Sequence, residues 1–295
     1  MAAIRKGSAL DIGRRFDARP LLLPWPGCPH VLIGGETGSG KSGVCNSIIG
    51  AAAGHPNVAI CGIDLKLVEL SRWRPRLTAL ATTPPQAARL LVAFRDLLTV
   101  RSRFMELHGH RMWRGEFGPW ILFLADELAE LQAVDADLLA DAIDADDGGR
   151  KALAAGKSGQ QVLTALFGSL ARMARSCGIT IVGATQYPSA EVIDQQIRTQ
   201  MAIRIMLRVA SGEQINVILG HGYGNQISPN SIGPSERGGL WIMGIDNATT
   251  PTRGRAHWVS DDDVTARVAA TAHLTPAYAQ VFGPPPSNDT EEANT

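Results

Sequence analysis

Several features that mark other classes of protein are scarce in this 295-residue sequence. Lysine occurs five times, and the 28 basic residues are balanced by 28 acidic ones, which excludes a histone-like blanket of positive charge but leaves room for a local basic channel. No apolar run approaches the roughly 20 residues of a transmembrane helix. The four cysteines form no C-x-x-C pair, so we expect small buried thiols, a reducing compartment and a cytoplasmic location.

Common catalytic and metal-binding patterns are absent as well. The seven histidines are scattered without metal-ligand spacing. No Ser-His-Asp or Cys-His arrangement is legible, and the chain has no internal repeat. Any chemistry must therefore come from other motifs.

One such motif is a glycine-rich segment at residues 35–42, which follows a short apolar run and precedes a helix-compatible run. It matches G-x-x-x-x-G-K-[ST] in the required strand, loop and helix setting. Glycines let backbone N–H groups approach phosphate oxygens, and the helix start adds its positive dipole end. We expect Lys41 to reach the β- and γ-phosphates and Ser42 to offer its hydroxyl to Mg²⁺. The predicted cofactors are ATP and Mg²⁺, and the predicted nucleotide-binding residues are Gly35, Glu36, Thr37, Gly38, Ser39, Gly40, Lys41 and Ser42.

A second motif is the apolar run at residues 120–125 that ends in Asp126 and Glu127. In an alternating β/α chain with the first motif, this pattern predicts that Asp126 holds Mg²⁺ through water. Glu127 would orient and deprotonate the attacking water, which favours hydrolysis over mere nucleotide holding. Gln186 follows the apolar run at residues 179–184, where an amide can hydrogen-bond the γ-phosphate or the water; the alternative is an ordinary surface amide.

The order of apolar runs predicts an α/β fold with a mainly parallel central sheet flanked by helices. Residues 1–29 form an N-terminal extension with two short strands, residues 30–275 the ATPase domain, and residues 276–295 a disordered acidic tail. The aspartate-rich segment 133–161 is predicted to be a flexible insertion, either a solvated loop or a contact with a partner.

Several segments together resemble the FtsK/SpoIIIE family of double-stranded DNA translocases. They are residues 30–42, 63–70 (I-D-L-K-L-V-E-L), 124–131, 174–179 and 184–189 (A-T-Q-Y-P-S). The resemblance runs from about residue 8 to about residue 260. It implies a RecA-like P-loop motor that works as a ring, usually a hexamer, around duplex DNA, with nucleotide at the subunit boundaries. By position, Arg175 matches the family's arginine finger, which acts on the neighbouring subunit's γ-phosphate.

The sequence also departs from that family. Leu65 stands where the family has proline, and Tyr187 stands where it has arginine. We see neither a membrane segment nor a C-terminal winged-helix module. The short form is more similar to transfer proteins of actinobacterial plasmids, integrative elements and phages, so both conjugation and cell division are possible settings.

Three functions are compatible with these patterns. The first is an ATP-driven translocase of double-stranded DNA, with Arg150, Lys151 and Lys157 as candidate grips. The second is a secretion or coupling ATPase that moves or recruits protein cargo. The third is a nucleotide-dependent switch without motor activity. The expected partners are duplex DNA, further copies of the chain in a hexameric ring, and a membrane-anchored protein.

Overall fold

The computed structural model describes residues 9–130, 159–193, 195–245 and 248–283. The predicted insertion at 133–161 lies outside these ranges except for its last three residues. Arg150, Lys151 and Lys157 also lie outside the described residues.

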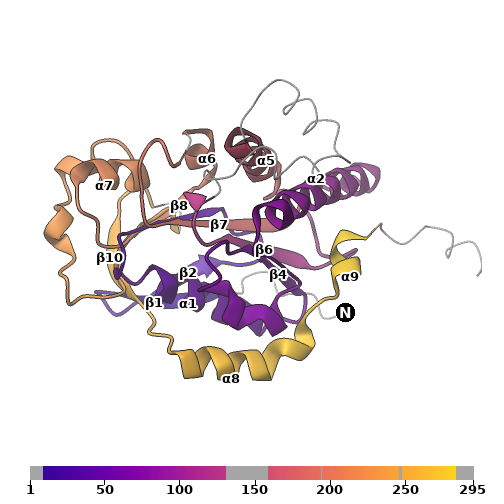
Figure 1. Ribbon diagram of the computed structural model, residues 1–295, viewed down its shortest axis with the longest axis horizontal. Helices are drawn as coiled ribbons and strands as arrows, with labels where there is room; N and C mark the ends of the chain where they lie inside the picture. The colour runs from indigo at the N-terminus through magenta and orange to yellow at the C-terminus, as the bar shows by residue number, and fades with distance from the viewer. Residues whose placement is uncertain (1–8, 131–158, 194, 246–247, 284–295) are drawn as a thin grey trace, which may run out of the picture.

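The described chain forms one ten-stranded sheet in the order β2-β1-β10-β9-β8-β3-β7-β6-β4-β5 (Figure 1). The strands are β1 (Ala9–Arg15), β2 (Pro20–Pro24), β3 (Val31–Gly34), β4 (Val58–Ile63), β5 (Ala79–Ala81), β6 (Trp120–Ala125), β7 (Ile179–Thr185), β8 (Ile203–Met206), β9 (Gly239–Met243) and β10 (Thr252–Ala256). The pairs from β8 through to β5 are all parallel. The pairs that add β9, β10, β1 and β2 are antiparallel.

Helices cover both faces of this sheet. They are α1 (Lys41–Ala53), α2 (Pro84–Leu107), α5 (Gly159–Met173), α6 (Gln195–Gln200), α7 (Gly212–Leu219), α8 (Asp261–Thr271) and α9 (Tyr278–Phe282), with 3₁₀ turns at Leu70–Arg76, Tyr223–Asn225, Pro229–Ser231 and Ala272–Leu274. Figure 1 shows α1 and α8 on one face and α2, α5 and α6 on the other. The α/β fold with a mostly parallel, helix-flanked sheet is therefore confirmed.

The central strands form because both of their faces are buried. Every residue of β3, β4, β6 and β7 is buried, so these strands read as continuous apolar runs rather than as alternating patterns. The four cysteines are buried and free, as the sequence predicts. The two short strands predicted for residues 1–29 are present as β1 and β2, which pair with each other. Helix α2 spans 24 residues, and a capping box at Ser260 starts α8.

The parallel arrangement brings functional segments to one edge of the sheet. The carboxyl ends of β3, β7 and β6 lead into the glycine-rich loop, Gln186 and Asp126 respectively. Strand β7 lies between the other two, yet Lys41 still reaches Asp126 because its long side chain projects across that edge. This edge is where ligands bind in open α/β sheets.

One prediction for the C-terminal region is wrong in part. The disordered tail was placed at 276–295, but Tyr278–Phe282 form helix α9. Val281 is buried, and the ring of Phe282 lies 5.1 Å from that of Phe94 in α2. Burial of these side chains anchors the helix, whereas the prediction rested on the prolines and acids that follow. Residues 284–295 lie outside the described chain. Within the described residues, no helix combines the length and apolar character needed to span a membrane.

Candidate active site

The glycine-rich loop has a shape that only glycine permits at two positions. Gly38 and Gly40 adopt φ angles of 78° and 102°, which other residues disfavour. A Cβ on Gly40 would lie 2.5 Å from the backbone nitrogen of Gly238. That nitrogen donates a hydrogen bond to the carbonyl oxygen of Ser39 at 2.9 Å, which fixes the loop. The start of α1, with its unpaired N–H groups, thus adjoins a loop of defined shape, as anion binding requires.

Lys41 and Asp126 form a buried ion pair at the base of the loop. The Lys41 ammonium donates to the Asp126 carbonyl oxygen at 2.8 Å and to its carboxylate at 3.0 Å, and both side chains are only 4% exposed. Burial raises the pKa of the Asp126 carboxyl, and the charge of Lys41 opposes that rise. The two sequence motifs, 85 residues apart, therefore meet in one site.

Glu127 lies beside Asp126 and contacts the backbone of Gln186 and the side chain of Lys66. Its carboxylate accepts a hydrogen bond from the backbone N–H of Gln186 at 3.0 Å and lies 3.7 Å from the Lys66 ammonium. The Gln186 side chain in turn accepts a hydrogen bond from the Thr37 hydroxyl at 2.9 Å. Gln186 therefore contacts Glu127 through its backbone and the glycine-rich loop through its side chain, and its catalytic role stays a prediction.

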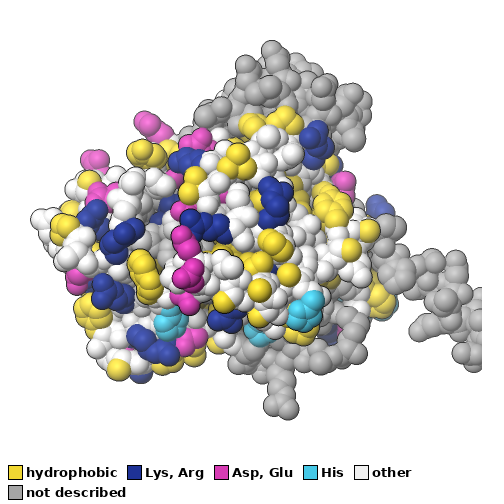
Figure 2. Space-filling model, turned by 60° about the horizontal axis from the view of Figure 1, so that its bottom comes forward, with side chains coloured by type: hydrophobic (Ala, Val, Ile, Leu, Met, Phe, Trp, Pro, Cys, Tyr) yellow, Lys and Arg dark blue, Asp and Glu magenta, His cyan; other side chains and the backbone are white. Residues whose placement is uncertain are grey.

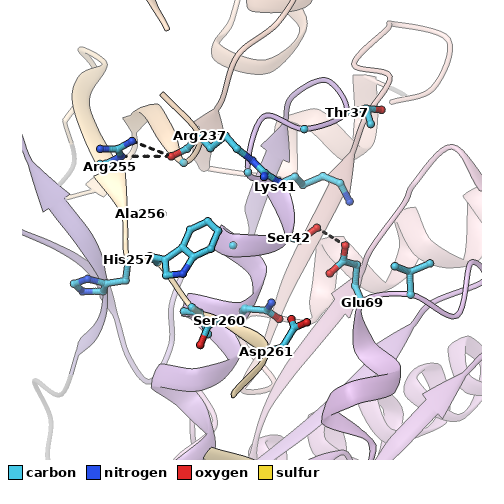
Figure 3. A pocket seen from close by; sticks show the side chains of 18 of the residues that line it. Thr37, Lys41, Ser42, Glu69, Arg237, Arg255, Ala256, His257, Ser260 and Asp261 are labelled. Atoms are coloured by element: carbon cyan, nitrogen blue, oxygen red, sulfur yellow. Dashed lines mark hydrogen bonds between the residues drawn. The ribbon is translucent and has the colours of Figure 1, made fainter. Parts of the chain in front are cut away.

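Residues 64–70 place a further carboxylate at the site. The buried Asp64 carboxylate accepts the N–H groups of Glu69 and Leu70 at 3.0 and 2.8 Å, which fixes the turn after β4. This turn presents the Glu69 carboxylate to the hydroxyl of Ser42, which donates a hydrogen bond to it (Figure 3). Sequence analysis used residues 63–70 only for the family resemblance and assigned Glu69 no role, because spacing alone does not show which acid faces the loop.

A cavity of about 1000 Å³ opens beside the loop, a volume at the upper end for ligand sites. Figure 3 shows Lys41, Ser42 and Glu69 on one side of it, and Arg255, His257 and Ser260 on the other. Trp258, which sequence analysis did not single out, also lines this second side.

The oxygen atoms near Ser42 fit magnesium. Its hydroxyl and the carboxylates of Asp126 and Glu69 are the ligand class that this ion takes. Among the described residues, no three His, Cys, Asp or Glu side chains form a ready-made metal cluster. A magnesium ion here would therefore depend on substrate phosphates and water for its remaining ligands, which is its usual mode in phosphate-binding sites.

Arg175 lies away from this cavity. It precedes β7, and its charge acts on His30 and Cys28, which precede β3. These positions are at the amino ends of the strands, whereas the glycine-rich loop is at the carboxyl ends. The exposed Arg175 is thus the one predicted catalytic residue that the fold does not bring to the site of its own chain.

The sequence matches the model of a known protein family. The model of the FtsK/SpoIIIE family matches residues 5–216. DNA translocase FtsK of Halalkalibacterium halodurans is 28% identical over 96% of this chain and 35% of its own length. DNA translocase SpoIIIE of Bacillus subtilis is 28% identical over 86% of this chain and 31% of its own length. The chain thus spans about a third of the length of these relatives.

Comparison with solved structures gives the same fold. The pCW3 conjugation coupling protein TcpA, solved with ATPγS, superimposes with a TM-score of 0.72 at 22% identity, covering 90% of this chain and 71% of that one. The cytoplasmic domain of the Thermomonospora curvata type VII secretion ATPase EccC gives 0.66 at 21% identity, covering 96% and 33%. At this identity the likeness supports the fold and leaves the cargo open.

Proposed function

This chain belongs to the FtsK/SpoIIIE family, and from that membership and the geometry of the cavity we propose that it is an ATP-driven motor for double-stranded DNA. The observation that carries the proposal is the contact of Lys41 with Asp126, which joins a phosphate-binding loop to a pair of acids. A loop without the acids would only hold nucleotide. The acids supply what hydrolysis needs, a metal ligand and a base.

Each of the predicted site residues Lys41, Ser42, Asp126, Glu127 and Gln186 has a defined task in this proposal. The loop amides and Lys41 bind the phosphates. Ser42 and Asp126 would hold Mg²⁺, and that ion would supply positive charge to the phosphates. Glu127 accepts the proton of the attacking water. Gln186 touches both Glu127 and Thr37, so it is placed to transmit the presence of a γ-phosphate from the loop to the base.

Duplex DNA is the proposed cargo. The relatives at 28% identity are named DNA translocases, and contacts of a translocase should be mainly to phosphates. On the face drawn in Figure 2, Lys and Arg side chains are interspersed with Asp and Glu rather than gathered in a broad basic patch. We therefore expect this face to make few phosphate contacts, and we propose that several copies of the chain act together in a ring.

ATP hydrolysis with and without duplex DNA tests the proposal. We expect duplex DNA to stimulate the rate, and the stimulation to fall between about 50 and 200 mM salt as phosphate contacts are screened. Lys41→Ala should abolish turnover, and Glu127→Gln should bind nucleotide without hydrolysing it. Glu106→Gln is a matched control, because Glu106 is an exposed acid at the end of α2 and should leave the rate unchanged.

The same assay separates the other functions. Hydrolysis that duplex DNA fails to stimulate at any salt concentration would favour an ATPase with protein cargo. Unchanged turnover in Glu127→Gln would favour a nucleotide-dependent switch. Normal hydrolysis in Lys41→Ala would remove the site assignment itself.

A further inference from the structure

The cavity beside the glycine-rich loop extends beyond the part that phosphates need. Its far side is the β10–α8 connection, residues 257–260, which faces Lys41 and Ser42 across the opening (Figure 3). A triphosphate bound at the start of α1 would leave this far side free for the rest of a nucleotide.

Trp258 is the most exposed tryptophan of the chain, at 75%. Four others are no more than 9% exposed, namely Trp25, Trp73, Trp113 and Trp120, and Trp241 is half-buried. An indole left in water forgoes the large hydrophobic gain that burial of its ring would give. The exposed ring lines the cavity, so a ligand that enters there would cover it.

The backbone on both sides of Trp258 is fixed. The N–H of Ala256 donates to Gly238 at 2.9 Å, and the N–H of His257 donates to Ile12 at 3.0 Å. After the tryptophan, Ser260 forms the capping box that starts α8. The indole therefore projects from a segment whose position is set in advance, which lowers the entropy cost of binding against it.

Helix α1 connects the two sides of the cavity. From Lys41, the helix passes Gly43 and Asn46, which line the cavity, to Ser47, whose hydroxyl donates to the carbonyl oxygen of His257 at 3.2 Å. Six positions along an α-helix correspond to about 9 Å. A Cβ at Gly43 would meet no heavy atom within 4 Å, so the surface of α1 is open at this point between the loop and the β10–α8 connection.

We propose that Trp258 is the stacking platform for the nucleobase of the bound nucleoside triphosphate. The base lies against the indole face while the phosphates lie in the loop. Stacking tolerates any base because each has a π-face. Trp258 therefore adds affinity for nucleotides over inorganic phosphates, with a preference for the larger purine ring. This subsite rests on the proposed nucleotide-binding function of the loop.

Paired binding measurements on the full chain test the subsite. The probes are the non-hydrolysable analogue AMP-PNP and inorganic tripolyphosphate, each with Mg²⁺, and Kd is measured by calorimetry. In Trp258→Ala we expect the Kd for AMP-PNP to rise about tenfold or more and the Kd for tripolyphosphate to stay within about twofold. Trp258→Phe should keep most of the AMP-PNP affinity, because phenylalanine retains a stacking face. Leu107→Ala, at an 81% exposed position outside the cavity lining, is the control for loss of a surface apolar side chain.

Three outcomes would overturn the subsite. An unchanged AMP-PNP Kd in Trp258→Ala, with wild-type binding intact, removes it and leaves the phosphate site standing. A change in oligomeric state by light scattering, with the ratio of the two Kd values unchanged, assigns Trp258 to contact with another copy of the chain. Failure of the wild type to bind either probe removes the proposed function and the subsite together.

Discussion

At the scale of single residues, the site is organised by pairs of buried charges rather than by isolated groups. Lys41 and Asp126 satisfy each other, and each side chain is only 4% exposed. Leaving either charge without its partner at such a depth would be costly, because buried ions need compensation. A bound triphosphate would offer Lys41 a second anionic partner, and Mg²⁺ would offer the Asp126 carboxylate a second cationic one. Ligand binding therefore redistributes contacts that already exist.

The variant Glu69→Gln tests whether Glu69 orients the hydroxyl of Ser42 for a metal ion. The Ser42 hydroxyl donates a hydrogen bond to the Glu69 carboxylate, so the lone pairs of the hydroxyl oxygen remain available to Mg²⁺. In Glu69→Gln we expect the Mg²⁺ concentration that half-saturates nucleotide binding to rise about tenfold, as for other partners of metal ligands. A magnesium titration of a fluorescent ATP analogue measures this concentration.

The control for Glu69→Gln is the neutralisation of a remote acid, Glu106→Gln, which should leave the magnesium titration unchanged. A titration of Glu69→Gln that coincides with the wild type would contradict the role of Glu69. Binding of the metal-free analogue gives a second reading. It should not weaken, because removal of a negative charge reduces repulsion of the phosphates.

The site residues that the sequence identifies lie within recognisable motifs, whereas those that it misses do not. Lys41 and Asp126 belong to motifs whose spacing is fixed by phosphate and metal chemistry, and the fold brings them together as predicted. Their catalytic roles stay predictions. Trp258 belongs to no such motif. Its place at the cavity follows from the pairing of β10 with β9 and β1, which no local pattern reports.

At the scale of elements, the strands buried on both faces were predictable and strand β10 was not. Strands β4, β6 and β7 are buried on both faces, so their sequences are uninterrupted apolar runs. Strand β10 has the sequence T-R-G-R-A, and only Gly254 within it is buried. Its formation depends on its neighbours, so tertiary pairing overrides a sequence with little strand character.

His30 connects two strands of the sheet, β3 and β7, with helix α5. It precedes β3, its Nδ1 accepts the N–H of Ile181 in β7 at 3.0 Å, and its Nε2 lies 2.9 Å from the carbonyl oxygen of Ala171 in α5. Both contacts are made when Nε2 carries the proton and Nδ1 does not, which is the neutral ring. Burial lowers the pKa of His30 to about 4, and the charge of Arg175 acts in the same direction.

The lowered pKa of His30 predicts that the free energy of unfolding decreases at acid pH. Unfolded His30 takes up a proton near pH 6.5, whereas the folded chain resists it until about pH 4. The unfolded state therefore binds more protons in this window, and the contribution of His30 to stability is complete above pH 6.5 and is lost as the pH falls toward 4. The full loss is about 3 kcal/mol at 1.36 kcal/mol per pKa unit. Urea unfolding at pH 7, 6 and 5 measures it.

The matched variants for this measurement are His30→Gln and His273→Gln. The first should flatten the decline in unfolding free energy between pH 7 and 5, because the titrating group is gone. The second removes an exposed histidine and should leave the decline unchanged. An equal decline in His30→Gln and the wild type would show that other groups cause it.

At the scale of the whole molecule, the position of Arg175 bears on assembly. Its chain holds it near His30 and Cys28, at the edge of the sheet opposite the cavity. An arginine that stabilises charge on a γ-phosphate must touch that phosphate. If Arg175 acts on a γ-phosphate, it must therefore do so in the cavity of another copy of the chain, and a ring of copies with heterologous contacts would supply one such cavity at every subunit boundary.

Mixing two inactive variants tests this arrangement. Arg175→Ala subunits keep a working cavity, and Glu127→Gln subunits keep a working arginine. If the arginine acts across a boundary between two subunits, an active boundary needs an intact Glu127 in one subunit and an intact Arg175 in its neighbour. In rings assembled at random from an equal mixture, each condition is met half of the time, so about a quarter of the boundaries are active. We expect the mixture to recover up to that fraction of wild-type ATP hydrolysis, whereas each variant alone stays inactive. A mixture of Lys41→Ala with Glu127→Gln is the control, because both changes damage the cavity and no boundary becomes active. If Arg175→Ala with Glu127→Gln stays as inactive as this control at every ratio, Arg175 does not act between subunits.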